Sequence, residues 1–235
     1  MIMTAKTIAS LLVASWVLAG CLPTENAPAS SAPPPAAKAE AKVEPAEADV
    51  VRPAPDPALV ALYASRKDGE KTVPAIDVTA FHRELLRNEI DYPTAEAPGT
   101  VVIDPHGPFL YLVEADGKAT RYGIAVGREG FGWSGSGTIA RRAKWPTWTP
   151  PPEMIARDPH VAKWKDGQPG GVTNPLGARA LYIYFGGQDS GYRIHGTNTP
   201  KSIGWAASSG CFRMLNQDVI DLYDRIPNGA RVVVL

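Results

Sequence analysis

The chain has 235 residues, of which 44% are hydrophobic and 20% are charged, and its 24 basic and 24 acidic side chains give a formal net charge of zero. This balance argues against a nucleic-acid binder, because such proteins need a basic excess to neutralise phosphates. The 22 glycines and 23 prolines favour a loop-rich, mainly β domain over a helical bundle.

The first 20 residues are expected to be a signal peptide. Lys6 precedes an apolar run over residues 8–18, which has the length of a secretory core segment and is too short to span a bilayer. The run ends in Leu18-Ala19-Gly20-Cys21, which resembles the signal of bacterial lipoproteins. The resemblance implies a lipidated Cys21 and a periplasmic protein anchored to a membrane. Leu22, in place of an aspartate, favours the outer membrane over the inner one. The alternative is an ordinary signal peptide with an incidental cysteine.

Residues 21–55 are expected to form a disordered tether. They are mostly Ala, Pro, Glu and Lys, with Pro33-Pro34-Pro35 near the centre. Such a composition buries too little apolar surface to offset chain entropy, and proline stiffens it into extended segments.

Residues 56–97 carry the signals of a helical extension. Asp77 or Thr79 could cap a short helix with an apolar side, and His82 is expected to face solvent on it. The residues on the apolar side are Phe81, Leu85 and Leu86.

Residues 98–235 have the pattern of a mainly β domain. Asp116-Gly117 is a strong hairpin-turn signal between two apolar stretches. Near the C-terminus, apolar residues spaced as on a helix follow Asn216, a plausible N-cap, and the helix is expected to stop at 227–229. Many short strands with few helices indicate a β-sandwich or barrel-like domain. The predicted strands cover 100–103, 109–114, 119–126, 180–185, 192–195 and 231–235, and the helix presents Val219, Leu222, Tyr223 and Ile226.

Residues 127–175 lack periodicity and are rich in Gly, Pro and Trp. A long irregular segment in a compact domain is usually a functional lid or disordered, and the tryptophans here argue against disorder. Its tryptophans, together with Trp205, either line a cleft or pack in the core. The segment contains a Gly-x-Gly-x-x-Gly match at 130–135. It is not a dinucleotide site, because no helix follows to receive the phosphates. The tryptophans are Trp145, Trp148 and Trp164.

The histidines give no sign of a metal or cofactor site. Four of them are scattered, without metal-ligand spacing or a cysteine pair beside them. His106 and His160 each follow an Asp-Pro pair and are expected in turns. We therefore expect no metal and no cofactor.

Cys211 and His195 are the candidate catalytic residues. With Cys21 lipidated, Cys211 would be the remaining thiol in an oxidising compartment, where such a thiol is either buried and inert or kept for chemistry. Gly210 allows consecutive backbone amides to converge as an oxyanion hole. His195 ends a predicted strand and could hold the thiol as its attacking thiolate. A buried core cysteine, or a Cys21–Cys211 disulfide, remains the alternative on spacing alone.

At these residues the sequence resembles the L,D-transpeptidases with a YkuD-type catalytic domain. The resemblance rests on three stretches, and it extends back to about Pro98 through Asn174-Pro175-Leu176-Gly177. It differs from some members in having Ser209, not His, before the Gly-Cys pair. The three stretches are His195-Gly196-Thr197-Asn198, Ser202-Ile203-Gly204 and Ser208-Ser209-Gly210-Cys211-Phe212-Arg213-Met214.

The resemblance implies a cysteine enzyme that acts on peptidoglycan tetrapeptide stems. Cys211 would form a thioester with release of D-alanine, and an amine would resolve it, either from another stem to give a 3→3 cross-link or from an envelope protein. His195 would act as base and then acid, and the Gly196 carbonyl would orient it. Amides of Gly210 and Cys211 would hold the oxyanion. The implied substrate-binding residues are Arg213, Ser209, Asn198 and Trp205. Carbapenem inhibition is also implied.

Two other functions stay open. One is a hydrolase or carboxypeptidase of the same bonds, in which water resolves the thioester. The other is a non-catalytic peptidoglycan-binding lipoprotein, which would not require a reactive thiol.

Overall fold

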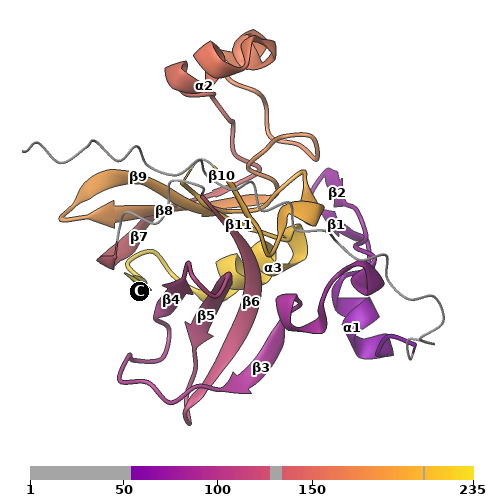
Figure 1. Cartoon of the computed structure of the whole chain (residues 1–235), viewed down its shortest axis with the longest axis vertical. Helices are drawn as coiled ribbons and strands as arrows, with labels where there is room; N and C mark the ends of the chain where they lie inside the picture. Colours follow the sequence, from indigo (N-terminus) through magenta and orange to yellow (C-terminus); the bar gives the residue numbers. More distant parts are fainter. Residues whose placement is uncertain (1–53, 128–133, 209) are drawn as a thin grey trace, which may run out of the picture. The chain divides into compact units, whose positions relative to one another are not determined.

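A computed structural model describes residues 54–127, 134–208 and 210–235 (Figure 1). The predicted signal peptide, Cys21 and nearly all of the tether lie outside the described residues. So do Ser209 and most of the Gly-x-Gly-x-x-Gly match. No helix in the described part of the chain is both long enough and apolar enough to cross a bilayer.

Eight strands close into a β-barrel. Each strand pairs with the next in the order β6-β11-β9-β8-β7-β12-β4-β5, and β5 pairs back with β6 to close the circle. Two short strands, β3 and β10, extend the sheet from β6. The bounds are β3 (Asn88–Asp91), β4 (Val101–Asp104), β5 (Phe109–Val113), β6 (Lys118–Gly127), β7 (Gly135–Lys144), β8 (Arg179–Phe185), β9 (Gln188–His195), β10 (Ala206–Ser208), β11 (Phe212–Met214) and β12 (Arg231–Val234).

The main hydrophobic core joins the barrel strands to one helix, α3 (Asn216–Arg225). All four apolar residues predicted to share a face of this helix lie in that core, so the helical period is confirmed. The predicted N-cap is wrong: Leu215 occupies the cap position, and Asn216 uses its side chain elsewhere. The helix ends before Pro227, as predicted.

The mainly β fold is confirmed, and so are the strands predicted from alternating or apolar runs. The irregular segment is wrong in part, because 135–144 forms β7 and two short helical pieces follow, α2 (Pro152–Arg157) and the 3-10 helix η4 (Pro159–Trp164). β7 escapes the pattern because Ile139 is its one buried residue and its one residue in the main core, so no apolar alternation marks the strand. Figure 1 shows α2 standing away from the sheet.

The N-terminal extension is less helical than predicted. It contains α1 (Pro57–Leu62) and a hairpin of β1 (Arg66–Asp68) and β2 (Lys71–Val73). The helix expected after Asp77 is replaced by two 3-10 turns, η1 (Val78–Ala80) and η2 (Arg83–Leu85), although Asp77 does cap the first one. His82 is exposed, as predicted. The expected apolar side packs all the same, because Leu86 is buried in a second core with α1.

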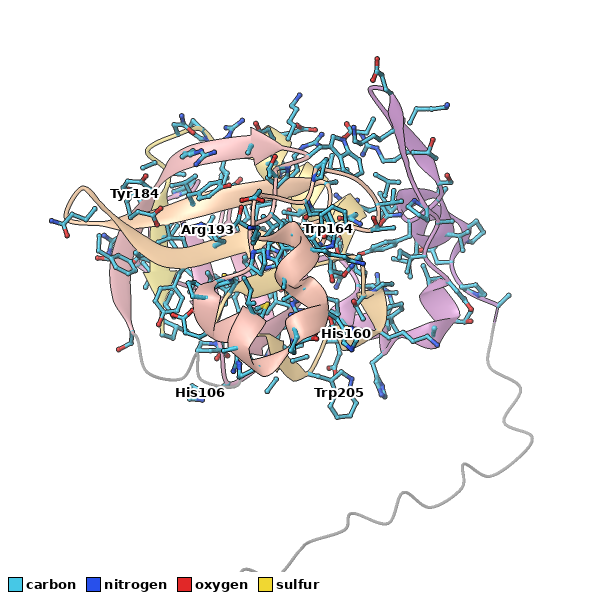
Figure 2. The ribbon with its side chains drawn as sticks, turned by 90° about the horizontal axis from the view of Figure 1, so that it is seen from above. His106, His160, Trp164, Tyr184, Arg193 and Trp205 are labelled. Carbon is cyan, nitrogen blue, oxygen red and sulfur yellow. The ribbon has the colours of Figure 1, made fainter. Side chains whose placement is uncertain are left out.

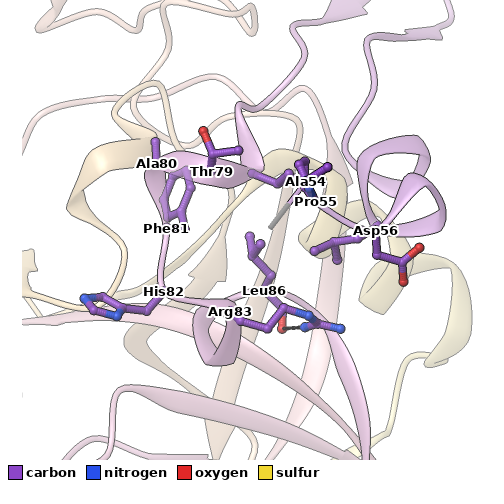
Figure 3. A pocket seen from close by; sticks show the side chains of 11 residues that line it. Ala54, Pro55, Asp56, Thr79, Ala80, Phe81, His82, Arg83 and Leu86 are labelled. Carbon is purple, nitrogen blue, oxygen red and sulfur yellow. Dashed lines mark hydrogen bonds between the residues drawn. The ribbon is translucent and has the colours of Figure 1, made fainter. Parts of the chain in front are cut away.

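A pocket of about 670 Å³ opens in this extension (Figure 3). Phe81 and Leu86 line its apolar part, and His82 and Arg83 lie at its polar edge. The catalytic candidates Cys211 and His195 are not among its lining residues. The pocket therefore belongs to the extension and not to the predicted site.

Candidate active site

The pairing of β9 with β11 places Cys211 and His195 on one face of the barrel wall. The two strands run parallel, with Phe212 opposite Ile194 and Arg213 opposite His195. Ile194 and Phe212 both point into the main core. Since side chains alternate along a strand, Arg213 and His195 point to the other face, and so does Cys211, just before β11. Two residues that are 16 positions apart in the sequence are thus neighbours diagonally across two strands.

His195 is held as a neutral base. Its Nδ1 lies 2.6 Å from the carbonyl oxygen of Gly196. A carbonyl can only accept, so Nδ1 carries the hydrogen and Nε2 is the basic nitrogen. The residue is 4% exposed, and burial lowers the pKa of His195 to about 4. The Gly196 contact opposes this shift, and the charges of Arg213 and Arg193 add to it. The Gly196 carbonyl makes the orienting contact that the resemblance implies.

The Cys211 thiol lies against β9. Its Sγ is 3.9 Å from the carbonyl oxygen of Gly191. Burial raises the pKa of Cys211, and a hydrogen bond from the Arg193 backbone and the charges of Arg193 and Arg213 oppose that rise. With the thiol pKa raised and the imidazole pKa lowered, the resting pair is neutral. His195 would therefore have to take the thiol proton during the attack.

Asn216 fixes the loop that follows His195, the last residue of β9. Its Oδ1 accepts hydrogen bonds from the backbone N–H groups of Ala178, at 2.9 Å, and Thr197, at 3.3 Å. Its Nδ2 donates to the Thr197 carbonyl at 2.8 Å. A Cβ on Gly196 or Gly177 would lie 2.2 Å from this Oδ1, so both positions require glycine for space. Asn216 therefore ties three segments together: the stretch before β8, the loop after β9 and the start of α3.

The residues expected to bind substrate lie in different surroundings. Arg213 is half-buried on the face that it shares with His195, and burial lowers its pKa. Asn198 is exposed, and its amide donates to the Thr173 carbonyl at 2.8 Å. Trp205 is 70% exposed and far from buried packing, as Figure 2 shows for its side chain. Ser209 lies outside the described residues.

The segment before β8 is a folded excursion closed by backbone bonds. Trp148 and Gln168 exchange N–H···O bonds of 2.9 and 2.7 Å at its base. Asn174, fully buried, donates to the Pro146, Gln168 and Pro169 carbonyls. The carbonyl of Pro175, the next residue, is close enough to His195 to oppose the fall in its pKa. The excursion thus reaches the His195 ring.

The tryptophans of this segment divide between packing and surface. The Trp145 indole donates to Asp68 on β1 at 2.7 Å and packs on a small core with Val73, which is a structural role. Trp148 and Trp164 are half-buried, and Figure 2 shows Trp164 on the projecting turn with His160. His106 lies in a turn, as predicted, whereas His160 lies in the 3-10 helix η4, so its predicted turn is wrong. The backbone N–H of each donates to the aspartate two positions earlier.

Arg193 is a site residue that the sequence patterns do not single out. It precedes His195 by two positions on β9, so it shares a face with His195, and its backbone is hydrogen-bonded to the Cys211 sulfur. Its backbone and its charge both lower the pKa of the thiol. Strand alternation on a known register would have found it, but the register becomes known only with the structure.

Metal-binding geometry is not seen in the described residues, where no three His, Cys, Asp or Glu side chains gather.

Comparison with known proteins points to one family. Residues 98–234 match the family model for the L,D-transpeptidase catalytic domain, YkuD. YkuD of Bacillus licheniformis is 36% identical over 137 residues, which are 58% of this chain and 66% of that protein. The Escherichia coli (strain K12) protein named Probable L,D-transpeptidase ErfK/SrfK is 37% identical over 102 residues, 42% of this chain and 30% of that protein.

Solved structures also resemble the chain. A crystal structure from Brucella melitensis, named a probable carnitine operon oxidoreductase, is 49% identical and covers 66% of this chain and 97% of that one, with a TM-score of 0.46. The chain spans less than two thirds of the length of the curated relatives that head the comparison.

Proposed function

This chain belongs to the family of L,D-transpeptidase catalytic domains, and from that premise we propose that it is a cysteine acyltransferase acting on peptidoglycan stem peptides. The observation that carries the proposal is the shared face of Cys211 and His195, with the ring held in one tautomer by Gly196. A non-catalytic wall-binding protein would need neither the thiol nor an oriented imidazole.

The proposed first half-reaction forms a thioester. Nε2 of His195 takes the thiol proton as Sγ of Cys211 attacks the carbonyl carbon of the third stem residue, a diamino acid. The imidazolium, stabilised by its Nδ1–H bond to Gly196, then protonates the nitrogen of the leaving D-alanine. The C–N bond breaks, and the acyl group remains on sulfur.

The second half-reaction transfers the acyl group to an amine. The acceptor loses a proton to Nε2 as it attacks the thioester, and the thiolate leaves and is reprotonated by His195. A diamino acid side chain as acceptor gives a 3→3 cross-link, and an envelope protein as acceptor becomes attached to the wall. We favour the cross-link, because it needs no second macromolecule.

Backbone amides at Gly210 and Cys211 are proposed to hold the oxyanion. Gly210 has φ +118°, a region that favours glycine, so the turn before Cys211 has an unusual course that a side chain would strain. Amides converging on one point in such a turn would stabilise the developing charge. Arg213, half-buried on the same face, is proposed to bind a stem carboxylate.

Turnover of purified disaccharide-tetrapeptide, followed by mass spectrometry, tests the proposal. The full chain should produce dimers that lack one D-alanine, and Cys211→Ala should produce none. Cys21→Ala is the matched control: it removes the other cysteine and should retain activity. Tripeptide without dimer would instead establish the hydrolase. No turnover by folded protein would favour the wall-binding protein.

We also propose that Cys21 carries a lipid that anchors the chain in the periplasm, with the outer membrane preferred. The support is the Leu18-Ala19-Gly20-Cys21 sequence. Expression in a bacterium supplied with a labelled fatty acid should label the protein, and Cys21→Ala should abolish the label. Label retained by that variant would contradict the anchor.

A further inference from the structure

Strand β9 carries a bulge next to the nucleophile. Tyr182 of β8 pairs with Arg193 and Tyr184 pairs with Asp189, so three residues of β9, 190–192, lie opposite the single residue Ile183. Gly191, in the middle, has φ +81°, which glycine adopts without strain. Bulges of this kind bend a strand and re-aim its groups, and they are frequent beside active sites.

Side chains within the strand close this bulge. The Ser190 hydroxyl donates to the Ile183 carbonyl at 2.5 Å and accepts from the Tyr192 N–H at 3.0 Å. Asp189 Oδ1 accepts from the Gly191 N–H at 3.0 Å. Hydrogen bonds from Asp189 and Ser190 therefore hold the backbone of the bulge.

An ion pair spans the same bulge from end to end. The two terminal nitrogens of Arg193 donate to the two oxygens of Asp189, at 2.7 and 2.9 Å. Nη1 of Arg193 also donates to the Tyr192 carbonyl at 3.0 Å, and the guanidinium lies 4.5 Å from the centre of the Tyr182 ring. A bidentate pair of this type fixes geometry as well as charge.

The bulge forms the surface on which the thiol lies. Its Gly191 carbonyl is 3.9 Å from Cys211 Sγ, and the Arg193 backbone at its end is hydrogen-bonded to that sulfur. The Tyr192 ring stacks on Phe212, with 6.3 Å between ring centres, and reaches to 3.9 Å from where a Cβ of Gly210 would lie. Each bulge residue after Ser190 thus touches the nucleophile or one of its two neighbours in sequence.

We propose that Asp189 and Arg193 form a clip that holds the β9 bulge and thereby positions the Cys211 thiol for attack. Both are positioning residues, since they act through the bulge. The inference rests on the proposed function only in taking Cys211 as the nucleophile. It assigns a role to two residues outside the stretches that identify the family.

A positioning role and a purely electrostatic role of the clip predict opposite effects on the reactivity of the Cys211 thiol. Removing the Asp189 carboxylate leaves the Arg193 charge uncompensated, and a nearby cation favours a thiolate. If charge alone mattered, Asp189→Asn would make the thiol react faster. If the clip holds the bulge, the same change lets the bulge move away from the Cys211 thiol. Both alkylation and acyl transfer should then slow down.

The test compares the full chain with Asp189→Asn, Asp189→Glu and Glu96→Gln. Asp189→Glu keeps the ion pair. Glu96→Gln is the matched control, because it breaks a similarly exposed pair with Arg231 elsewhere on the barrel. Turnover of disaccharide-tetrapeptide and the pH dependence of Cys211 alkylation by iodoacetamide are measured, with thermal unfolding as a check on folding.

We expect Asp189→Asn to lower kcat about 10-fold with KM changed less than about 2-fold, the size of effect that a misplaced reacting group gives. Alkylation at pH 7 should slow at least about 3-fold, because a displaced bulge loses the Arg193 backbone hydrogen bond that lowers the pKa of the thiol. Asp189→Glu should recover most of both losses, and Glu96→Gln should match the wild type. Unchanged kcat, or faster alkylation in Asp189→Asn, would overturn the clip. Alkylation needs no stem peptide, so this result stays distinct from a failure of the proposed function.

Discussion

Two polar residues near the start of α3, Asn216 and Asp218, make structural contacts of different kinds. The neutral side-chain amide of Asn216 makes three hydrogen bonds to backbone groups in the stretch before β8 and in the loop after β9. Asp218, fully buried two positions later, accepts from the Tyr63 hydroxyl at 2.9 and 3.0 Å and lies 3.8 Å from Nε of Arg87. The first fixes the site, and the second docks the N-terminal extension.

The difference concerns pH. The Asn216 contacts contain no titratable group, so protonation does not alter them. Burial raises the pKa of Asp218 to about 7, with Arg87 and Tyr63 opposing the rise. The same side of the helix also holds Asp221, which pairs with Arg87 and accepts from Tyr122 at 2.6 Å. A change of pH should therefore weaken the contacts between α3 and the N-terminal extension before it disturbs the loop after β9.

The largest effect is expected from Asn216→Ala. It leaves the buried N–H groups of Ala178 and Thr197 without their acceptor, at about 1–3 kcal/mol for each unsatisfied group. Unfolding by urea should show a loss of roughly 2–4 kcal/mol, and turnover should fall about 100-fold as His195 loses its place. Asn228→Ala, which removes an exposed amide in the turn after α3, is the control. Equal small losses in both variants would refute the special role of Asn216.

The acid limb of the pH–rate profile should lie near pH 4. The pKa of His195 is lowered to about 4, so its basic nitrogen stays available well below the ordinary value near 6.5. At pH 5 a histidine with an ordinary pKa would already have lost roughly 30-fold of its neutral form. We expect kcat/KM at pH 5 to remain close to its neutral value. An acid limb at pH 6–7 would show that the surroundings of the His195 ring are more polar than the structure indicates.

Asp218→Asn should flatten the dependence of stability on pH. A carboxyl whose folded pKa is raised binds its proton more tightly when folded, so the wild type loses stability as pH rises from about 4 to about 7. The amide cannot ionise and should unfold with a free energy that varies by about 1–3 kcal/mol less over that window. Urea titrations at pH 4.5 and 8 measure this. The same slope in both proteins would assign the titration elsewhere.

Trp205→Ala should have the smallest effect on stability. The side chain is 70% exposed, so its removal should change the free energy of unfolding by less than about 0.5 kcal/mol. If Trp205 contacts the stem, as the resemblance implies, KM should rise a few-fold with kcat unchanged. An unaltered KM would remove it from the substrate-binding residues.

The parts of the fold that were predictable from sequence are those whose residues repeat with a period. The apolar alternation and the i, i+3, i+4, i+7 spacing in α3 follow from burial on one side, and burial dominates those elements. β7 lacked this signal, because Ile139 is its one residue in the main core. The helix expected over 77–86 failed because its apolar residues pack from two 3-10 turns instead.

The candidate site divides in the same way. Cys211, His195 and Gly196 were identified because their chemistry and sequence are distinctive. Asn216, Asp189 and Arg193 were not, because their roles depend on which strand lies beside which. The bulge in β9 arises from the pairing with β8, and a hydroxyl, a carboxylate and a glycine in sequence do not specify that pairing.

The assignment of Cys211 as nucleophile can be tested by the intact mass of the full chain after brief exposure to a low concentration of disaccharide-tetrapeptide, which keeps the acceptor amine scarce. We expect an adduct with the mass of the disaccharide-tetrapeptide less D-alanine, located on the peptide that contains Cys211 and missing from Cys211→Ala. In His195→Ala the same adduct should form far more slowly. An adduct that persists in Cys211→Ala, or none in folded wild-type protein, would contradict the assignment of Cys211 as the nucleophile.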